Sequence, residues 1–381
     1  MFDKSAELFP IKNEYVFLTH CSISPLFSKA LEKEIEISRE HQNTGAILFD
    51  EYDRILDDLR SAAGELLDTS PDNLSFVKNT SEGLCMVANG YPFEPGDQVI
   101  SYIHEYPANH YPWKLQEERG AELLLLPDRD VAGDVCGGRP CGWSMKDLEA
   151  LVTDRTRIVA VSHVQFASGF GCDLKLLGEF CKARNIDLVI DAAQSLGSLP
   201  LDPEELHISA IAASGWKWLL GPVGTGLLYT SEVFREKLDH VMVGAEMMEQ
   251  GMDYLDHAWQ PHRTGKRFEY STSPISLATA LEVCIRELPL RYGLEAIRDE
   301  IFRLQDMIIN GLNRERYTPV IFPSSNRSGI LSMVCRDDPE QIAERLVELG
   351  VVCSARGGYL RLAPHFYNSD DEIDRVVSLL S

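Results

Sequence analysis

Lys217 is the residue whose surroundings most clearly favour covalent chemistry. It lies in the run ASGWKWLLGPVGTGLLY, where Ser214, Gly215 and two tryptophans place the amine among small and aromatic side chains. Because such surroundings exclude water, they favour the neutral amine, which is the form that attacks an aldehyde. The alternative is a lysine whose charged end extends from a loop or helix start into solvent. Residues elsewhere in the chain decide between the two.

An acidic residue follows a buried apolar run upstream of this lysine. The run IDLVI leads into DAAQS, so Asp191 stands at the carboxyl end of a predicted parallel strand, where open α/β sheets bind ligands. A carboxylate at this place can keep the nitrogen of a pyridine ring protonated. Its alternative role is that of a helix N-cap. Asp191 and Lys217 lie 26 positions apart, which assigns them to separate adjacent strands.

Two further segments supply groups that a phosphorylated aromatic ligand needs. The sequence KNTSEGL follows the apolar run LSFV and opens a predicted helix, so Thr80 and Ser81 can offer hydroxyls and helix-start amides to an anion. Their alternative role is ordinary helix capping. After the run QVISYI, the segment HEYPANHYPW places His104, Tyr106 and Trp113 where an aromatic ring can cover a ligand, and Tyr106 is our candidate.

A lysine, an acid, a phosphate cradle and a stacking ring are the groups that pyridoxal 5′-phosphate (PLP) chemistry requires. We therefore predict that Lys217 holds PLP as an internal aldimine, and that the substrate is an amino acid or amine. A nucleotide-binding enzyme is excluded because neither GxGxxG nor GxxxxGK[ST] follows an early strand.

The segments NTSEGL, EYPANHYPW, DAAQS, SGWKWLLGP, RFEYST and YLRLAPHFYN, in this order, resemble the class V aminotransferases of PLP fold type I, a group that includes cysteine desulfurases and isopenicillin N epimerase-like proteins. The resemblance covers nearly the whole chain. It implies a homodimer with shared active sites, to which Thr272 in RFEYST contributes a ligand for the partner's phosphate. The other cofactor contacts that it implies are Lys217 as the Schiff-base lysine, Asp191 at the ring nitrogen, Gln194 beside the ring hydroxyl, Ser81 and Ser214 at the phosphate, and the Thr80 amide.

The resemblance also implies where the substrate binds. Arg361 in YLRLAPHFYN is similar to the family arginine that holds the substrate α-carboxylate, a task suited to a rigid bidentate fork. His20 and Ser22 are further candidate substrate residues. Two departures from the family pattern are Trp216 before the lysine and Tyr106 at the stacking position, where many members carry histidine. Trp216 is expected to contact the cofactor.

Transamination through a Cα carbanion is the function that the family name implies. The same intermediate also permits C–S lysis or another β-elimination, and epimerisation. Desulfurase activity is disfavoured because it needs an exposed thiolate on a flexible loop before the arginine strand, whereas CSARGGYLR is short and Cys353 falls within a predicted strand. A non-catalytic binding protein of the same fold is the remaining alternative.

The alternation of apolar runs with helical patterns from about residue 73 to residue 229 predicts an α/β fold with a mostly parallel seven-stranded sheet. We expect three parts: an N-terminal segment, 1–30, that packs on the small domain and active site; a large PLP-binding domain, 31–270; and a smaller C-terminal α+β domain, 271–381. Within them, single helices are expected at 108–119 and 276–288, and a strand at VIFPS. The stretch 243–267 is expected to be a surface or interface excursion.

Bulk properties limit the partners and the location. The formal charge of −23 disfavours nucleic acid and anionic membranes, which attract basic faces. No uncharged run approaches the length of a membrane span, and the first ten residues do not resemble a signal peptide, so a cytoplasmic location is expected. The nine cysteines form no disulfide framework. Cys136 and Cys141 in CGGRPC could bind a metal or oxidise, but no second ligand pair lies nearby in the sequence, and we expect no metal.

Overall fold

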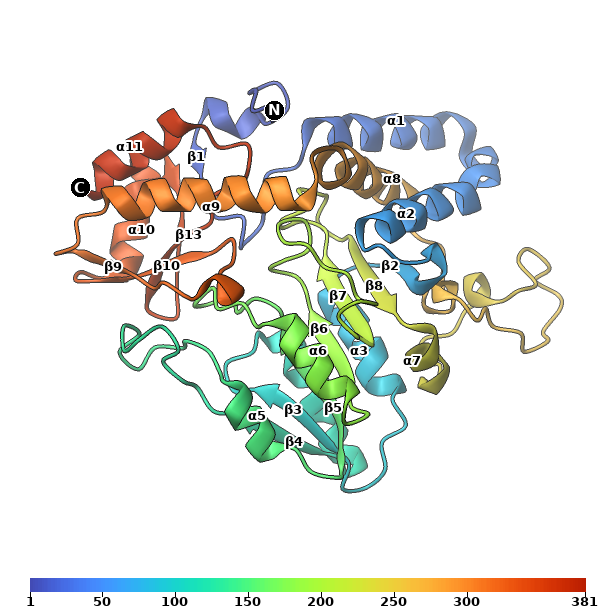
Figure 1. Ribbon diagram of the computed structural model, residues 1–381. Coiled ribbons are helices and arrows are strands. Elements are labelled where there is room, and N and C mark those ends of the chain that lie inside the picture. Colours follow the sequence, from blue (N-terminus) through green and yellow to red (C-terminus); the bar gives the residue numbers. More distant parts are fainter.

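The structure is a computed structural model that describes residues 1–381 (Figure 1). A seven-stranded sheet forms its centre. Its seven strands lie in the order β2 (Leu74–Val77), β8 (Gly226–Thr230), β7 (Ala210–Ser214), β6 (Asp187–Asp191), β5 (Thr156–Ser162), β3 (Gln98–Tyr102), β4 (Glu122–Leu126). All seven strands run in the same direction except β8, which is antiparallel to both of its neighbours. Most of these strands are buried along their whole length, because both faces of the sheet are covered. The predicted mostly parallel sheet is confirmed.

Helices follow most of these strands and pack on the two faces of the sheet (Figure 1). They are α3 (Thr80–Gly90), α4 (Tyr111–Leu115), α5 (Met145–Leu151), α6 (Leu174–Lys182) and α7 (Glu232–Lys237). The single helix predicted at 108–119 is wrong, since the chain forms 3₁₀ turns at Pro107–Asn109 and Gln116–Arg119 on either side of α4. Pro112 is the reason that a new helix starts there, because a proline supplies no amide and is tolerated only in the first turn of a helix.

A second, antiparallel sheet forms the C-terminal part. Its strands lie in the order β12 (Ser354–Arg356), β13 (Tyr359–Leu362), β10 (Leu331–Cys335), β9 (Tyr317–Pro319), and its helices are α9 (Leu294–Gly311), α10 (Pro339–Glu348) and α11 (Asp370–Leu380). The strand predicted at VIFPS is misplaced, because β9 ends where that segment begins. Only the Val320 amide continues the ladder, donating to the Ser332 carbonyl at 2.8 Å.

The N-terminal segment contacts both parts of the molecule, since the Phe27 amide also donates to the Leu220 carbonyl at 3.1 Å. Its strand β1 (Val16–Phe17) pairs with β11 (Val351–Val352) of the C-terminal part. The chain then forms α1 (Ser28–Thr44) and α2 (Tyr52–Leu66), which pack against α8 (Ile275–Ile285). A π-helical turn extends α8, so the helix predicted at 276–288 is longer than expected. The domain boundaries stay a prediction; α8 lies beyond the expected boundary yet packs against helices before it.

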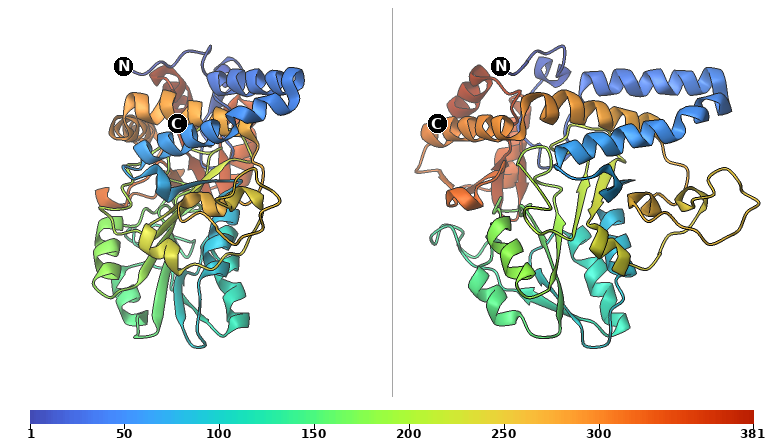
Figure 2. Two further views of the ribbon diagram at one scale, coloured as in Figure 1. Left: turned by 90° about the vertical axis from the view of Figure 1, so that its right-hand side faces the viewer. Right: turned by 45° about the vertical axis from the view of Figure 1, so that its right-hand side comes forward.

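One segment extends away from the body of the molecule. Residues 240–263 form a long excursion with a single 3₁₀ turn, which projects to one side in Figures 1 and 2. Its side chains include exposed Met252, Leu255 and Trp259. The surface excursion predicted at 243–267 is therefore confirmed for most of its length, whereas its end, from Gly265, forms a 3₁₀ turn that packs against β2. No helix in the structure has the length and apolar composition needed to cross a membrane.

Candidate active site

A cavity of about 760 Å³ opens where the carboxyl ends of the central strands meet the C-terminal sheet. Most of the residues that the sequence predicted for the site line it together: Ser22, Thr80, Ser81, Tyr106, Asp191, Gln194, Ser214, Trp216, Lys217 and Arg361. They come from segments spread over most of the chain. The sheet brings them together because parallel strands end on the same edge, which is where open α/β sheets bind ligands.

Lys217 lies three residues beyond the end of β7, in a turn where the Gly215 amide donates to the Thr225 carbonyl at 2.9 Å. Its Nζ forms no hydrogen bond or ion pair with another residue, and it lies 5.7 Å from the centre of the Tyr106 ring. Burial lowers the pKa of the Lys217 amine, and Arg361 acts in the same direction, while Asp191 opposes the shift. A half-buried amine without a partner is suited to attack a carbonyl carbon.

Asp191 is the last residue of β6 and is buried. One carboxylate oxygen accepts a hydrogen bond from the Ala193 amide at 2.9 Å, and the other has no protein partner. Burial raises the pKa of Asp191, whereas the Ala193 amide and Lys217 hold it down. The free oxygen of this carboxylate can therefore accept a hydrogen bond from a cationic ring nitrogen in the cavity.

An anion can bind at the start of α3. The Asn79 side chain caps this helix by accepting from the Glu82 amide at 2.8 Å. Thr80 is tied to the end of β7, because its hydroxyl and that of Ser214 lie 2.8 Å apart. The Ser81 hydroxyl is exposed to the cavity and forms no hydrogen bond. Helix-start amides, the helix dipole and these hydroxyls together suit a phosphate group.

Tyr106 stands beside the cavity on the segment that follows β3. Its ring meets Phe166 edge-on, with ring centres 5.3 Å apart, and about half of its surface is exposed. The neighbouring Glu105 points inward instead, where it accepts hydrogen bonds from the Ser162 amide and from Gln165, each at 2.8 Å. Burial raises the pKa of Glu105 to about 7.

Gln194 and Trp216 also line the cavity, and each is bonded to the segment around residues 21–24. The Gln194 amide nitrogen donates to the Cys21 carbonyl at 2.9 Å, and its oxygen accepts from the Trp218 indole at 3.3 Å. These two bonds fix which atoms of the amide can face a ligand. Trp216, whose carbonyl accepts from the Ser24 amide at 3.0 Å, is half-buried.

Arg361 projects from β13 and is 3% exposed. Its guanidinium donates to the Phe166 carbonyl and to the Ser354 hydroxyl, the latter at 3.0 Å. Its buried Nε has no partner. Since an unpaired buried donor is costly, this guanidinium is well placed to receive a carboxylate from the cavity.

Two predicted site residues do not line the cavity. His20 is fully buried, and its ring nitrogens lie 2.7 Å from the Ala363 carbonyl and 2.7 Å from the Tyr367 hydroxyl. Both ring nitrogens therefore already have protein partners. The prediction that His20 contacts the substrate is corrected, because His20 bonds neighbouring residues and does not line the cavity. Thr272 lies instead in a separate hollow beside Lys78 and Glu82.

Several residues of the cavity wall were not predicted from the sequence: Cys21, Asn79, Ser162, Val164 and Arg356. Glu105, which lies behind the wall, was not predicted either. A carboxylate between an apolar strand and a candidate stacking ring was the available signal for Glu105. No local pattern marked Ser162 or Val164, because they belong to a continuous apolar run.

The cavity contains groups that match each part of PLP. The amine of Lys217 has no partner and can bond the aldehyde carbon, and the free oxygen of Asp191 can pair with the ring nitrogen. The start of α3 offers an unpaired hydroxyl for the phosphate. This donor set fits the cofactor that the sequence predicts.

Comparisons with known proteins identify the family of the chain. The family model "Aminotransferase class-V" matches residues 25–376. A probable cysteine desulfurase of Methanothermobacter thermautotrophicus is 27% identical, over 96% of this chain and 93% of the relative. The uncharacterized aminotransferase YcbU of Bacillus subtilis is 24% identical, over 97% and 95% of the two chains.

Solved structures show the same fold. The apo cysteine desulfurase of Thermococcus onnurineus superposes with a TM-score of 0.85 at 24% identity, covering 97% of this chain and 94% of that one. A C-DES variant with glycine covalently linked to its PLP cofactor has a TM-score of 0.88 at 21% identity, covering 100% and 99%. The chain therefore belongs to the class V aminotransferase family, has the PLP fold type I, and is a PLP-dependent enzyme.

Proposed function

We propose that this enzyme cleaves the Cβ–S bond of a sulfur-containing α-amino acid by β-elimination. Two observations support the proposal, one for the kind of substrate and one against sulfur transfer to a protein thiol. Relatives along nearly the whole chain are named as probable cysteine desulfurases, which points to a sulfur-containing substrate. The hairpin between β12 and β13 turns through Gly357 and Gly358 and carries no thiol, and this is the observation that carries the proposal.

The cysteine next to that hairpin is unsuited to accept sulfur. Cys353 is buried, and burial raises the pKa of its thiol to about 12. Sulfur transfer requires an accessible thiolate, so this residue is a packing group. Cys21 lines the cavity, but it is 3% exposed and its Sγ lies 3.8 Å from the Thr19 hydroxyl. The sulfur leaving group would then depart as a small molecule.

In this proposal the side chains of the cavity divide the work. When bound, PLP supplies an electron sink that acidifies the substrate Cα–H bond. Lys217 holds the cofactor and its neutral amine accepts the Cα proton, while Arg361 orients the substrate carboxylate. Asp191 pairs with the ring nitrogen. The remaining contacts proposed are Thr80, Ser81 and Ser214 to the phosphate, Tyr106 and Trp216 to the ring, and Gln194 to the ring hydroxyl.

Product analysis tests the reaction. Holoenzyme would be given L-cystine, L-cysteine and other β-substituted amino acids, with and without a keto acid. We expect pyruvate and ammonia without any acceptor, and the same products from the Cys21→Ser variant. Lys217→Ala should be inactive. Alanine as the product would contradict elimination and show desulfuration, while a new amino acid formed only with a keto acid would show the transamination that the family name implies.

We also propose a homodimer with shared active sites. The support is that Thr272 lies outside the cavity of its own chain, in a hollow that a second copy could face. Light scattering should give twice the chain mass. Mixing inactive Lys217→Ala with a Thr272→Ala variant should restore part of the activity, because one of the two sites would then be intact. A monomer would contradict the proposal. A cytoplasmic enzyme without nucleic-acid or membrane partners stays our prediction, supported by the charge of −23.

A further inference from the structure

A closed surface loop lies beside the active site and encloses two cysteines. Residues 129 and 142 join its ends, since the Arg129 amide donates to the Gly142 carbonyl at 2.7 Å and the reverse bond is 3.2 Å. Inside the loop, Cys136 and Cys141 have no exposed surface. The loop contains no regular secondary structure, so its interior contacts hold its shape.

The two thiols and one carboxylate meet in the interior of this loop. The sulfur atoms of Cys136 and Cys141 and a carboxylate oxygen of Asp130 all lie within 4.8 Å of one another. The Cys141 thiol lies 3.8 Å from Asp130. A hydrogen bond from the Cys141 thiol lowers the pKa of Cys136. One thiol of the pair is therefore the easier to ionise, which is the property of a dithiol that exchanges with disulfides.

A metal ion fits this cluster less well. Structural zinc sites need four converging ligands, and three are present. The Asp130 oxygens already accept from the Cys136 amide at 2.7 Å and the Ala132 amide at 3.3 Å. The nearby Tyr359 hydroxyl donates to the Pro140 carbonyl at 3.0 Å, so it does not supply the fourth ligand.

We propose that Cys136 and Cys141 form a reversible disulfide that transmits the thiol–disulfide state of the surroundings to the substrate site. The Cys136 thiolate attacks a low-molecular-weight disulfide, forms a mixed disulfide and releases one thiol. Cys141 then attacks the mixed disulfide and releases the second thiol. Two protein thiols are oxidised, one external disulfide is reduced to two thiols, and the protons remain with the products.

Contacts of the loop extend to Arg361. The Arg139 guanidinium donates to the Gly358 carbonyl at 2.9 Å, which fixes the loop to the turn before β13. On the other side, the Ser168 hydroxyl donates to the Cys141 carbonyl at 2.5 Å. Ser168 belongs to the segment whose Phe166 carbonyl accepts from Arg361. A shift of the cysteines can therefore reach Arg361 by two routes, through the segment that contains Phe166 and through the turn that precedes β13.

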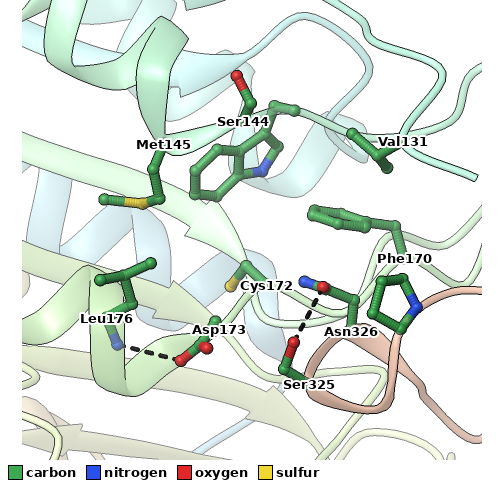
Figure 3. A pocket seen from close by; sticks show the side chains of 11 residues that line it. Val131, Ser144, Met145, Phe170, Cys172, Asp173, Leu176, Ser325 and Asn326 are labelled. Atoms are coloured by element: carbon green, nitrogen blue, oxygen red, sulfur yellow. Dashed lines mark hydrogen bonds between the residues drawn. The ribbon is translucent and has the colours of Figure 1, made fainter.

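The loop also has space in which to move. Gly133 and Gly138 have positive φ angles of 80° and 79°, and a side-chain carbon built on either would meet nothing within 4 Å. A cavity of about 330 Å³ lies beside the loop and is lined by Val131 of the loop and by Phe170 (Figure 3). Rearrangement of the loop can therefore admit a small disulfide without unfolding the sheet.

Mass spectrometry and kinetics on the holoenzyme test the proposal. Treatment with oxidised glutathione should remove two mass units from the chain and link the Cys136 and Cys141 peptides. The KM for the amino-acid substrate should rise by about fivefold, the size of a modest coupling between sites, and should recover with dithiothreitol. The Cys136→Ser and Cys141→Ser variants should show neither the link nor the KM change. Cys181→Ser, which alters a buried thiol elsewhere, should behave as wild type.

Three results would overturn the proposal. The first is the absence of a Cys136–Cys141 link after oxidation of folded enzyme. The second is a link that leaves KM unchanged, because the coupling to Arg361 would then be absent. The third is stoichiometric zinc in the purified enzyme that is lost in both serine variants, which would make the cluster a metal site.

Discussion

Glu105 offers a quantitative test of the electrostatics behind the active site. Its carboxylate is 7% exposed and accepts hydrogen bonds from the Ser162 amide, the Ser162 hydroxyl and the Gln165 side chain. Burial is the largest influence on its pKa, which rises to about 7 from an ordinary 4.5, and Asp191 adds to the increase. The hydrogen bonds oppose this rise but do not cancel it. The structure therefore keeps Glu105 protonated over a range where the unfolded chain ionises.

The sign and size of the effect follow from these pKa values. Between pH 4.5 and 7 the folded state binds a proton at Glu105 that the unfolded state has lost, so the contribution of this group to stability falls as pH rises. The difference between 4.5 and about 7 corresponds to about 3 kcal/mol. Glu105→Gln has the same shape and does not titrate. The variant should therefore gain about 3 kcal/mol relative to wild type between pH 4.5 and 8.

Thermal unfolding of both proteins as holoenzymes at several pH values measures this gain. Comparing the two proteins at each pH cancels the other titrating groups, which they share. The variant's unfolding temperature should rise relative to that of wild type as the pH increases. A gap that is independent of pH, or one that moves in the opposite direction, would refute the assignment of a raised pKa to Glu105.

Three further predictions concern named residues. Arg361→Gln should raise the KM for the amino-acid substrate by about tenfold or more in steady-state assays, because a charge-assisted contact to the carboxylate is lost; an unchanged KM would place the carboxylate elsewhere. Asp191→Asn should lower kcat by about a hundredfold with a smaller change in KM, since a buried charge beside the reacting system is removed; a change confined to KM would contradict this role. Glu269→Ala should lower the unfolding free energy by about 3–5 kcal/mol in denaturant titration, because it leaves buried Arg60 with only the exposed Asp57 as an ion partner and the Phe76 amide unbonded. A loss below about 1 kcal/mol, the value of an exposed pair, would show that this buried pair is not structural.

The sheet could be predicted from the sequence because its strands are short apolar runs with clear boundaries. All seven runs form strands of the central sheet. The same logic identified Asp191, since a strand end fixes where a side chain must lie. The helix prediction at 108–119 was wrong because the amphipathic spacing continues across a proline, whose nitrogen cannot donate a backbone hydrogen bond.

Contacts between distant segments could not be predicted from the sequence. His20 was a reasonable candidate for the cavity from its type and position, but its nitrogens are engaged by Ala363 and Tyr367, more than 340 positions away. Nothing in the sequence indicates that Asp130 lies close to Cys136 and Cys141, whereas the fold of the loop brings all three together. Such placements depend on how loops fold back, which periodicity does not encode.

Lys217 is the residue that we expect to carry PLP. Reduction of the purified holoenzyme with borohydride fixes the bond between the cofactor and its lysine, and peptide mass spectrometry then locates the modified residue. We predict loss of the visible cofactor absorption and a phosphopyridoxyl group on Lys217 alone. A group on another lysine, or an unmodified Lys217 in enzyme that retains full activity, would contradict the account.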